Sequence, residues 1–164
     1  GKKLQFFDPE LNQSYVPYVV ETSVGLDRMF LAVLSAAYQE EALADGSERV
    51  VLKIPAVLAP YKAAILPLIK KDGLPEKARE IMAQLQLEYS VQYDEKDSIG
   101  KRYRRQDAIG TPFSITVDHQ TLEDHTVTIR DRDTMNQERI AISALENVIA
   151  DKASWKRVLA DLIS

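Results

Sequence analysis

The stretch Ala63-Ala64-Ile65-Leu66-Pro67-Leu68-Ile69 decides the fold of this 164-residue chain. This apolar run has the length of a strand and falls far short of the ~18 residues that a membrane span needs. Uninterrupted apolar runs of this kind are typical of strands that are buried on both faces of a sheet. We therefore expect a buried strand at residues 63–69.

Short strands and helices alternate on both sides of this run. Upstream, residues 50–54 predict an extended segment, and downstream Pro75 suits the first position of a helix. The polar loop 118–125 separates two alternating segments, which predicts an antiparallel pair of strands. This order predicts an α/β domain with a mixed sheet and helices packed on its faces. The other predicted elements are a strand at 90–93, a helix that Ser98 caps and Gly110 ends, strands at 113–117, 126–130 and 139–143, a helix opened by a Ser143-x-x-Glu146 capping box, and a closing helix capped by Ser154.

The first 47 residues have a different pattern. Val19-Val20 suits a short strand, and Glu21-Thr22-Ser23-Val24-Gly25-Leu26-Asp27-Arg28 opens a helix with one apolar stripe. Glu40-Glu41 and Ala44-Asp45-Gly46-Ser47 predict a polar turn that ends this helix and marks a domain boundary. Because one helix and one strand cannot bury a core, we expect residues 1–47 to be the end of another domain. The chain lacks an initiator Met, and we expect it to be part of a longer protein.

The composition excludes several classes of protein. Apolar residues make up 45% of the chain and charged residues 28%, which excludes a disordered tail or a fibrous protein. The absence of cysteine excludes disulfides, thiolate metal sites and a Cys nucleophile, and it fits a reducing compartment. The net charge of −4 still allows a nucleic-acid partner, because a local basic patch matters more than the total.

Motifs for catalysis are missing from residues 50–164. There is no complete glycine-rich phosphate loop and no Gly-x-Ser-x-Gly elbow. His119 and His125 lie six residues apart in a polar loop, where histidines are more often solvated than bound to metal. We therefore expect a non-catalytic α/β module.

Two charged motifs stand out in this acidic chain. Lys101-Arg102-Tyr103-Arg104-Arg105 is either a solvated helix paired with Glu95, Asp97 and Asp107, or a phosphate-binding patch that Tyr103 anchors or extends by stacking. In Arg130-Asp131-Arg132-Asp133, extended backbone would place both arginines on one face and both aspartates on the other. This second motif is either an exposed edge or a surface that offers donors and acceptors to unpaired bases.

Several stretches resemble a known family. The segment 21–28 resembles motif 3 of the class II aminoacyl-tRNA synthetases. Downstream, Leu58-Ala59-Pro60-Tyr61-Lys62, residues 98–107, Gly110-Thr111-Pro112-Phe113 and residues 128–134 are similar to the anticodon-binding domain of that class. Together they are most similar to the homodimeric glycyl-tRNA synthetase family. This resemblance implies a class IIa anticodon-binding domain at 48–164, a mixed five-stranded sheet with helices on both faces (three layers, α/β/α).

The resemblance also implies a function. The complete family enzyme ligates glycine to tRNA(Gly) using ATP with Mg²⁺, as a homodimer in the cytoplasm. Motif 3 would bind glycine through Glu21 and Ser23, and the ATP phosphates through Arg28, because carboxylates pair with ammonium groups and guanidinium groups with phosphates. Motifs 1 and 2 are missing, so we expect this chain to bind tRNA without catalysis. We expect it to need no cofactor or metal and to bind neither membranes nor DNA.

The expected contacts with the anticodon stem-loop fall into two groups. Phosphate contacts are assigned to the basic helix motif, and base contacts to the strand ends and the loop between them. Glycine anticodons end in two cytosines, which the family reads, and a cytosine edge needs both an acceptor and a donor. The predicted contacts are Lys101, Arg102, Arg104 and Arg105 for phosphates, and Phe113, Asp118, His119, Thr121, Arg130 and Arg132 for bases.

Two alternatives remain open from the sequence. The first is a related fold used for protein interaction, as in the accessory subunit of a mitochondrial DNA polymerase. The second keeps the class and changes the amino acid to proline, threonine or histidine. The presence of Glu21, Ser23 and Arg28 favours the ligase over the first, and the segments 98–107 and 130–134 favour glycine over the second.

Overall fold

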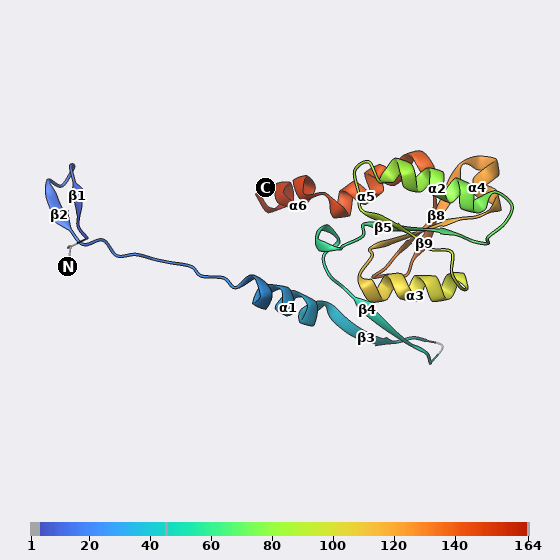
Figure 1. Cartoon of the computed structure of the whole chain (residues 1–164), viewed down its shortest axis with the longest axis horizontal. Helices are drawn as coiled ribbons and strands as arrows, with labels where there is room; N and C mark the ends of the chain where they lie inside the picture. The colour runs from blue at the N-terminus through green and yellow to red at the C-terminus, as the bar shows by residue number, and fades with distance from the viewer. Residues whose placement is uncertain (1–3, 45, 164) are drawn as a thin grey trace. The chain divides into compact units, whose positions relative to one another are not determined.

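The computed structural model describes residues 4–44 and 46–163, without the side chains of 157, 158, 161 and 162. It contains two compact units, Gly1–Leu31 and Ala32–Ser164 (Figure 1). The boundary expected after residue 47 stays a prediction. Among the described residues, no helix is both long and apolar enough to cross a membrane.

The first unit contains a small hairpin. Strands β1 (Phe6–Asp8) and β2 (Gln13–Tyr15) pair antiparallel, and the rings of Phe6 and Tyr15 meet edge to face at 5.9 Å. The strand predicted at Val19-Val20 was wrong: the two side chains are 81% and 94% exposed, and no described strand pairs with them. Helix α1 (Leu26–Ala37) then begins in the predicted region and continues into the second unit.

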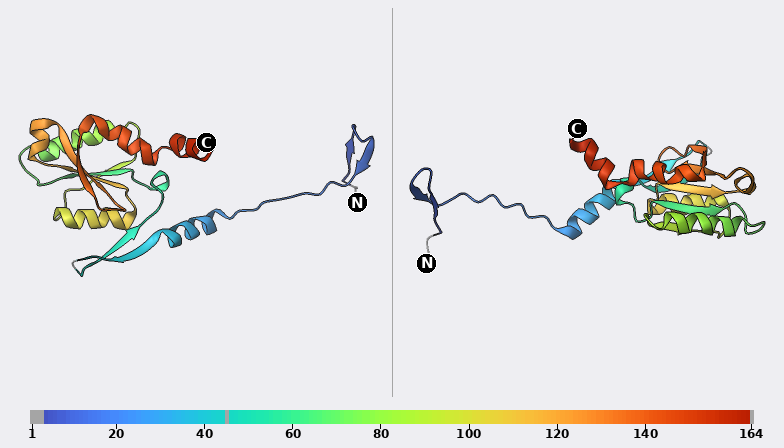
Figure 2. Two further views of the ribbon diagram at one scale, coloured as in Figure 1. Left: turned by 180° about the vertical axis from the view of Figure 1, so that it is seen from behind. Right: turned by 90° about the horizontal axis from the view of Figure 1, so that it is seen from above.

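The second unit is built on a five-stranded mixed sheet with the order β6-β5-β7-β8-β9 (Figures 1 and 2). Strand β5 is parallel to β6 and β7, whereas β8 is antiparallel to β7 and β9. Every residue of β5 is buried, as the apolar run predicted. The strands are β5 (Ala63–Pro67), β6 (Val91–Tyr93), β7 (Phe113–Val117), β8 (Thr126–Asp131) and β9 (Gln137–Ala141).

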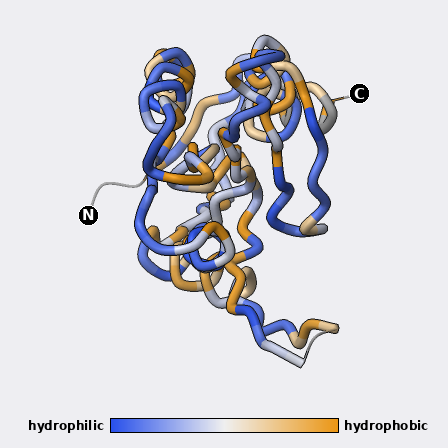
Figure 3. The backbone as a smooth tube through the Cα atoms, turned by 90° about the vertical axis from the view of Figure 1, so that its right-hand side faces the viewer, coloured by the Kyte–Doolittle hydropathy of each residue, from blue (hydrophilic) through white to orange (hydrophobic). Residues whose placement is uncertain are grey.

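Helices cover both faces of this sheet, which confirms the three-layer architecture. Helices α2 (Leu74–Leu85), α4 (His119–Asp124) and α5 (Leu145–Ala153) lie on one face, and α3 (Ile99–Ile109) lies on the other (Figures 1 and 2). Hydrophobic and hydrophilic residues alternate along the helices (Figure 3). The main apolar core lies under α2 and α5 and includes Ile65, Leu74, Ile115, Leu145 and Ile149.

The layer under α3 contains buried polar groups beside apolar ones. This helix buries Arg102, Gln106 and Asp107 against the sheet. The sheet presents Ser114 and Arg130, which are paired neighbours on β7 and β8, to the same face. Because buried polar groups need hydrogen-bond partners, the contacts of this layer fix how α3 sits on the sheet.

Three local predictions were wrong. Residues 40–41 do not form a turn: they lie in β3 (Tyr38–Ala42), which pairs antiparallel with β4 (Glu48–Leu52) outside the main sheet. The predicted strand at 50–54 therefore belongs to this hairpin. The loop 118–125 contains helix α4, which Asp118 caps. The predicted capping box at Ser143 is absent, because η2 (Ile142–Ala144) precedes α5, whose N-cap is Ala144. The remaining elements are η1 (Ala56–Leu58) and α6 (Trp155–Ile163).

Candidate nucleic-acid interface

The carboxyl ends of β5, β6 and β7 meet at one edge of the sheet, here called the carboxyl edge. The β5 loop (residues 68–72) and the β6 loop (residues 94–98) extend from it, and α3 begins there. The helix after β5 lies on one face of the sheet and the helix after β6 on the other. In α/β sheets, ligands bind outside the strand ends at such a reversal. The carboxyl edge is therefore the first place to look for a binding site.

Two basic side chains of α3 are available at this edge. Lys101 is exposed and Arg104 is partly exposed. Within the described part of the chain, neither side chain forms an ion pair, and Nη1 of Arg104 is buried without a hydrogen-bond partner. Lys101 is therefore available to a phosphate, and Arg104 is available through the exposed part of its side chain.

Arg102 lies on the opposite side of the helix from solvent. It is 3% exposed, and its Nη1 donates to the carbonyl oxygen of Pro67 at 2.6 Å. Its Nη2 donates to the carbonyl of Leu68 at 3.2 Å, and Nη1 also reaches that of Asp94 at 3.3 Å. The prediction that Arg102 contacts a phosphate is at odds with this burial.

Arg105 is bound to acidic and main-chain groups of the β6 loop. Its Nε and Nη2 donate to Oδ2 of Asp94 at 3.0 and 2.8 Å, and Nη1 donates to Asp97 at 2.9 Å. These hydrogen bonds, that to Asp94 foremost, raise the pKa of Arg105. The Arg105 side chain is 40% exposed, so it lies at the surface. Its ion pair with Asp97 is one that the solvated-helix alternative predicted.

The residues at the start of α4 combine capping and exposure. Asp118 accepts from the backbone N–H of Thr121 and from both terminal nitrogens of Arg139, at 2.6 and 2.9 Å. The Arg139 hydrogen bonds hold the pKa of Asp118 below its ordinary value. His119 is exposed, with Nε2 3.0 Å from Asp72. Thr121 is fully buried and completes the capping box, so it supports the helix and does not face a ligand.

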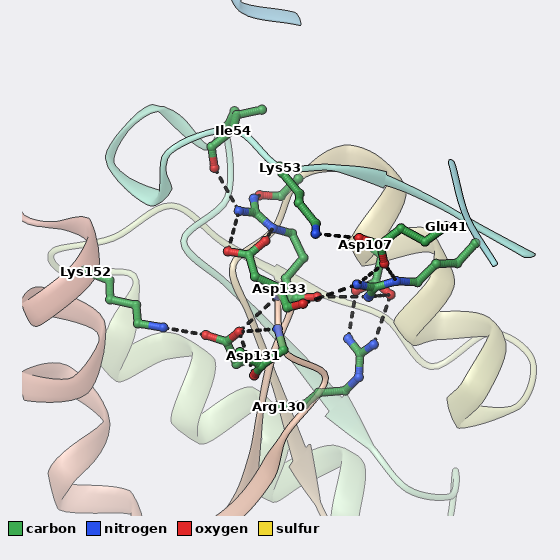
Figure 4. Close-up of polar contacts among 12 residues, drawn as sticks. Glu41, Lys53, Ile54, Asp107, Arg130, Asp131, Asp133 and Lys152 are labelled. Atoms are coloured by element: carbon green, nitrogen blue, oxygen red, sulfur yellow. Dashed lines mark hydrogen bonds and ion pairs between the residues drawn. The ribbon is translucent and has the colours of Figure 1, made fainter. Parts of the chain in front are cut away.

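The other predicted base contacts lie at the opposite edge of the sheet. Phe113 is 3% exposed and belongs to the apolar core. Arg130 forms two hydrogen bonds with Asp107, at 2.7 and 3.0 Å, and its guanidinium carbon lies 4.9 Å from the ring centre of Tyr103. Arg132 donates to the carbonyls of Gly110 and Ile54 (Figure 4). Both arginines are at most 5% exposed, so neither forms the exposed edge or the open surface that the alternation predicted.

These arginines are held in place by residues that the sequence motifs did not reveal. Asp107 is fully buried and lies between Arg130 and Arg49 of β4, whose Nη1 is 3.1 Å from Asp107. Arg49 also donates to Glu41 of β3 and to the carbonyl of Arg132 (Figure 4). We call Glu41, Arg49, Asp107 and Arg130 the Asp107 cluster. These charged residues are far apart in the sequence, so the cluster can be recognised only once the fold brings β4, α3 and β8 together.

The residues assigned to glycine and ATP lie in the first unit. Glu21 and Ser23 belong to a segment without regular secondary structure, and Arg28 lies in the first turn of α1. All three are exposed. No group of three or more metal-binding side chains occurs in the described ranges, 4–44 and 46–163.

The fold and the unpaired cations at the carboxyl edge define an α/β module suited to an anionic ligand, and comparison with known families specifies it further. A family model described as "Anticodon binding domain" matches residues 62–152, more than half of the chain. The chain belongs to this family.

Individual relatives and solved structures agree with that assignment. The chain is 55% identical over 152 residues to the Glycine--tRNA ligase of Chlorobaculum tepidum, which covers 93% of this chain and 32% of that protein. It is 53% identical over 155 residues to that of Clostridium tetani, covering 94% and 33%. The chain thus spans about a third of the length of these relatives.

Two solved structures share the fold. The RNA binding domain of threonyl-tRNA synthetase from Cryptosporidium parvum Iowa II matches 62% of this chain and 26% of that chain, with a TM-score of 0.56 at 23% identity. Prolyl-tRNA synthetase from Cryptosporidium parvum, complexed with L-proline and AMP, matches 75% and 34%, with a TM-score of 0.57 at 18% identity. At this identity the two structures support the mixed α/β architecture alone.

Proposed function

We propose that this chain is the anticodon-binding part of a glycine–tRNA ligase and that it binds the tRNA(Gly) anticodon stem-loop at the carboxyl edge. One observation carries the location: Lys101, in the first turn of α3, and Arg104, one turn further along, have no ion pair among the described residues, and Arg102 between them binds carbonyls of the β5 and β6 loops. The assignment to glycine rests on the relatives at 53–55% identity. These relatives also favour the ligase over an interaction module and over the proline, threonine or histidine paralogues.

The chemistry of the edge suits an anticodon loop, whose bases are unpaired and can be splayed outward. Lys101 and Arg104 would bind phosphates, and Arg105, paired with Asp94 and Asp97, would hold the β6 loop. The exposed ring of His119 offers a flat face for stacking, and the Asp118 carboxylate offers an acceptor for a cytosine amino group. The buried members of the predicted set (Arg102, Phe113, Thr121, Arg130 and Arg132) would act through the framework that they hold.

The catalytic part of the proposal concerns the complete enzyme. Residues 1–47 would belong to its catalytic domain and residues 48–164 to the anticodon-binding domain. Glu21 and Ser23 would bind glycine, and Arg28 would bind the ATP phosphates, with Mg²⁺ as the accompanying ion. The enzyme would act as a homodimer in the cytoplasm. For the chain alone we expect no glycine-dependent ATP–pyrophosphate exchange, and exchange by a pure preparation would contradict this assignment.

The site is tested by titrating the tRNA(Gly) anticodon stem-loop against the chain at several salt concentrations. The variant Lys101→Ala with Arg104→Ala should bind more weakly, and its salt slope should fall by about one unit for each phosphate that is no longer neutralised. The matched control is Lys77→Ala, which removes a lysine of α2 that is paired with Glu80. An unchanged slope in the double variant, or the same fall in the control, would place the RNA elsewhere.

A further inference from the structure

Arg102 connects two loops that come from different strands. Its Nη1 donates to Pro67, the last residue of β5, and its Nη2 to Leu68 in the β5 loop. The same Nη1 reaches the carbonyl of Asp94 in the β6 loop. A single guanidinium group on α3 therefore sets the distance between these loops at the carboxyl edge.

A lysine could not replace this group. The guanidinium is planar and presents its donors in a fixed fork, whereas an ammonium group is a compact point charge on a flexible stem. Burial lowers the pKa of Arg102, and no carboxylate lies within ion-pair distance in the described part of the chain. A buried cation that binds only carbonyl oxygens is costly to keep.

Arg105 braces the β6 loop from the same helix, one turn away from Lys101. It binds the Asp94 carboxylate through two nitrogens and the carbonyl of Lys96 at 2.5 Å. Asp94 in turn accepts from the backbone N–H of Lys96. Although burial opposes the charged form, these hydrogen bonds keep the pKa of Asp94 below its ordinary value. The β6 loop is therefore held at both its backbone and its carboxylate.

We propose that Arg102 and Arg105 are positioning residues: they hold the β5 and β6 loops at the spacing that base recognition needs and do not themselves neutralise RNA phosphates. This inference rests on the proposed function of the carboxyl edge. It assigns the four cations of the 101–105 motif to two tasks. Lys101 and Arg104 supply affinity that is sensitive to salt, whereas Arg102 and Arg105 supply discrimination between anticodons.

Variants that keep the charge separate these two tasks. Arg102→Lys and Arg105→Lys retain a cation but lack the fork that reaches several oxygens, so discrimination should fall while the salt slope stays the same. Discrimination is the ratio of the dissociation constants for native and cytosine-substituted stem-loops. We expect it to fall about tenfold, the scale of one well-made base contact. Lys101→Ala should do the reverse, with a lower slope and unchanged discrimination.

Hydrogen exchange reports the loops without any RNA. The backbone N–H groups of Leu68 and Asp94 are hydrogen-bonded to Val117 and Ile65, and they should exchange faster in both lysine variants than in Lys101→Ala. Because Arg105 is partly exposed, Arg105→Lys should fold and can be tested even if Arg102→Lys does not fold. Full discrimination by a folded lysine variant, or a lower salt slope with discrimination intact, would overturn the positioning role. Failure of the unmodified chain to bind the stem-loop would instead overturn the proposed function.

Discussion

The two ends of helix α3 use the same residue types in opposite ways. At its first turns, Arg102 and Arg105 bind the carbonyls and carboxylates of loops, and Lys101 remains exposed. Near its last turn, Asp107 is fully buried between Arg49 and Arg130. The first end thus binds loops and leaves Lys101 exposed to solvent, whereas the second end neutralises charge inside the protein. Charge in a sequence shows its role only when the partner of each charge is known.

The largest effect should come from breaking the buried end. Asp107→Ala leaves the guanidinium groups of Arg49 and Arg130 buried without their shared carboxylate, and removal of one partner of a buried ion pair costs about 3–5 kcal/mol. The measurement is the free energy of unfolding in urea. The matched control is Asp97→Ala at the other end of the helix, where the pair with Arg105 is exposed and worth at most about 1 kcal/mol. Equal costs in the two variants would remove the distinction between the two ends.

Truncation tests whether the hairpin belongs to the buried end. Residues 32–164 keep Glu41 of β3, which Arg49 binds at 2.6 Å, whereas residues 48–164 lack it together with the whole strand. We expect the shorter piece to be less stable by about 2 kcal/mol, the scale of one hydrogen bond to a charged group. Comparison of the two unfolding free energies gives the answer. If the two pieces are equally stable, β3 contributes nothing and the boundary after residue 47 gains support.

Two glycines at opposite edges of the sheet give a smaller contrast. Gly110 follows α3 with a φ of +83°, and a Cβ there would lie 3.1 Å from the carbonyl oxygen of Leu52. Gly73 has a φ of +79° and open space around it. Both alanine variants bear the cost of a left-handed backbone, about 1 kcal/mol, and Gly110→Ala adds a steric clash. We expect Gly110→Ala to lower the melting temperature clearly more than Gly73→Ala, and the reverse order would contradict the packing of β4 on α3.

The sequence predicted the sheet much better than the site. The apolar run at 63–69 predicted the buried strand β5 from a local pattern, whereas the five-stranded sheet was expected only from the family resemblance. The hairpin of β3 and β4 did not follow from a local pattern, because Glu40-Glu41 has the composition of a turn. In the structure these two residues pair with residues 49 and 50 of β4.

The basic motif shows where the prediction of the site reached its limit. Helical periodicity places Arg102 and Gln106 one turn apart on one side of α3, and both are buried. Periodicity alone does not say which side faces the sheet, because the sheet face under α3 includes polar side chains such as Ser114 and Arg130. Arg139, which holds Asp118, was not predicted as a site residue either, because their contact depends on the pairing of β8 with β9.

Acid should weaken the carboxyl edge through Asp118. Its pKa in the folded state is lowered, chiefly by the hydrogen bonds from Arg139, from an unfolded value of about 3.9. A lowered folded pKa means that the contribution to stability is complete well above pH 4 and disappears as the pH falls through the folded value. In Arg139→Gln, the free energy of unfolding should therefore fall less between pH 5 and pH 2 than in the unmodified chain. A parallel pH dependence in the two proteins would show that this pair contributes no stability.

The smallest effect is expected at the first residue of α3. Ser98 is the N-cap of this helix, but its side chain makes no capping hydrogen bond, so Ser98→Ala should cost at most a few tenths of a kcal/mol. Asp118, the N-cap of α4, accepts from Thr121 and takes part in a complete capping box, and Asp118→Ala should cost about 1 kcal/mol or more. Urea unfolding of both variants measures the difference. A cost near 1 kcal/mol at Ser98 would mean that its hydroxyl caps the helix after all, and that the exposed end of α3 is fixed by its own residues as well as by the loops that Arg102 and Arg105 hold.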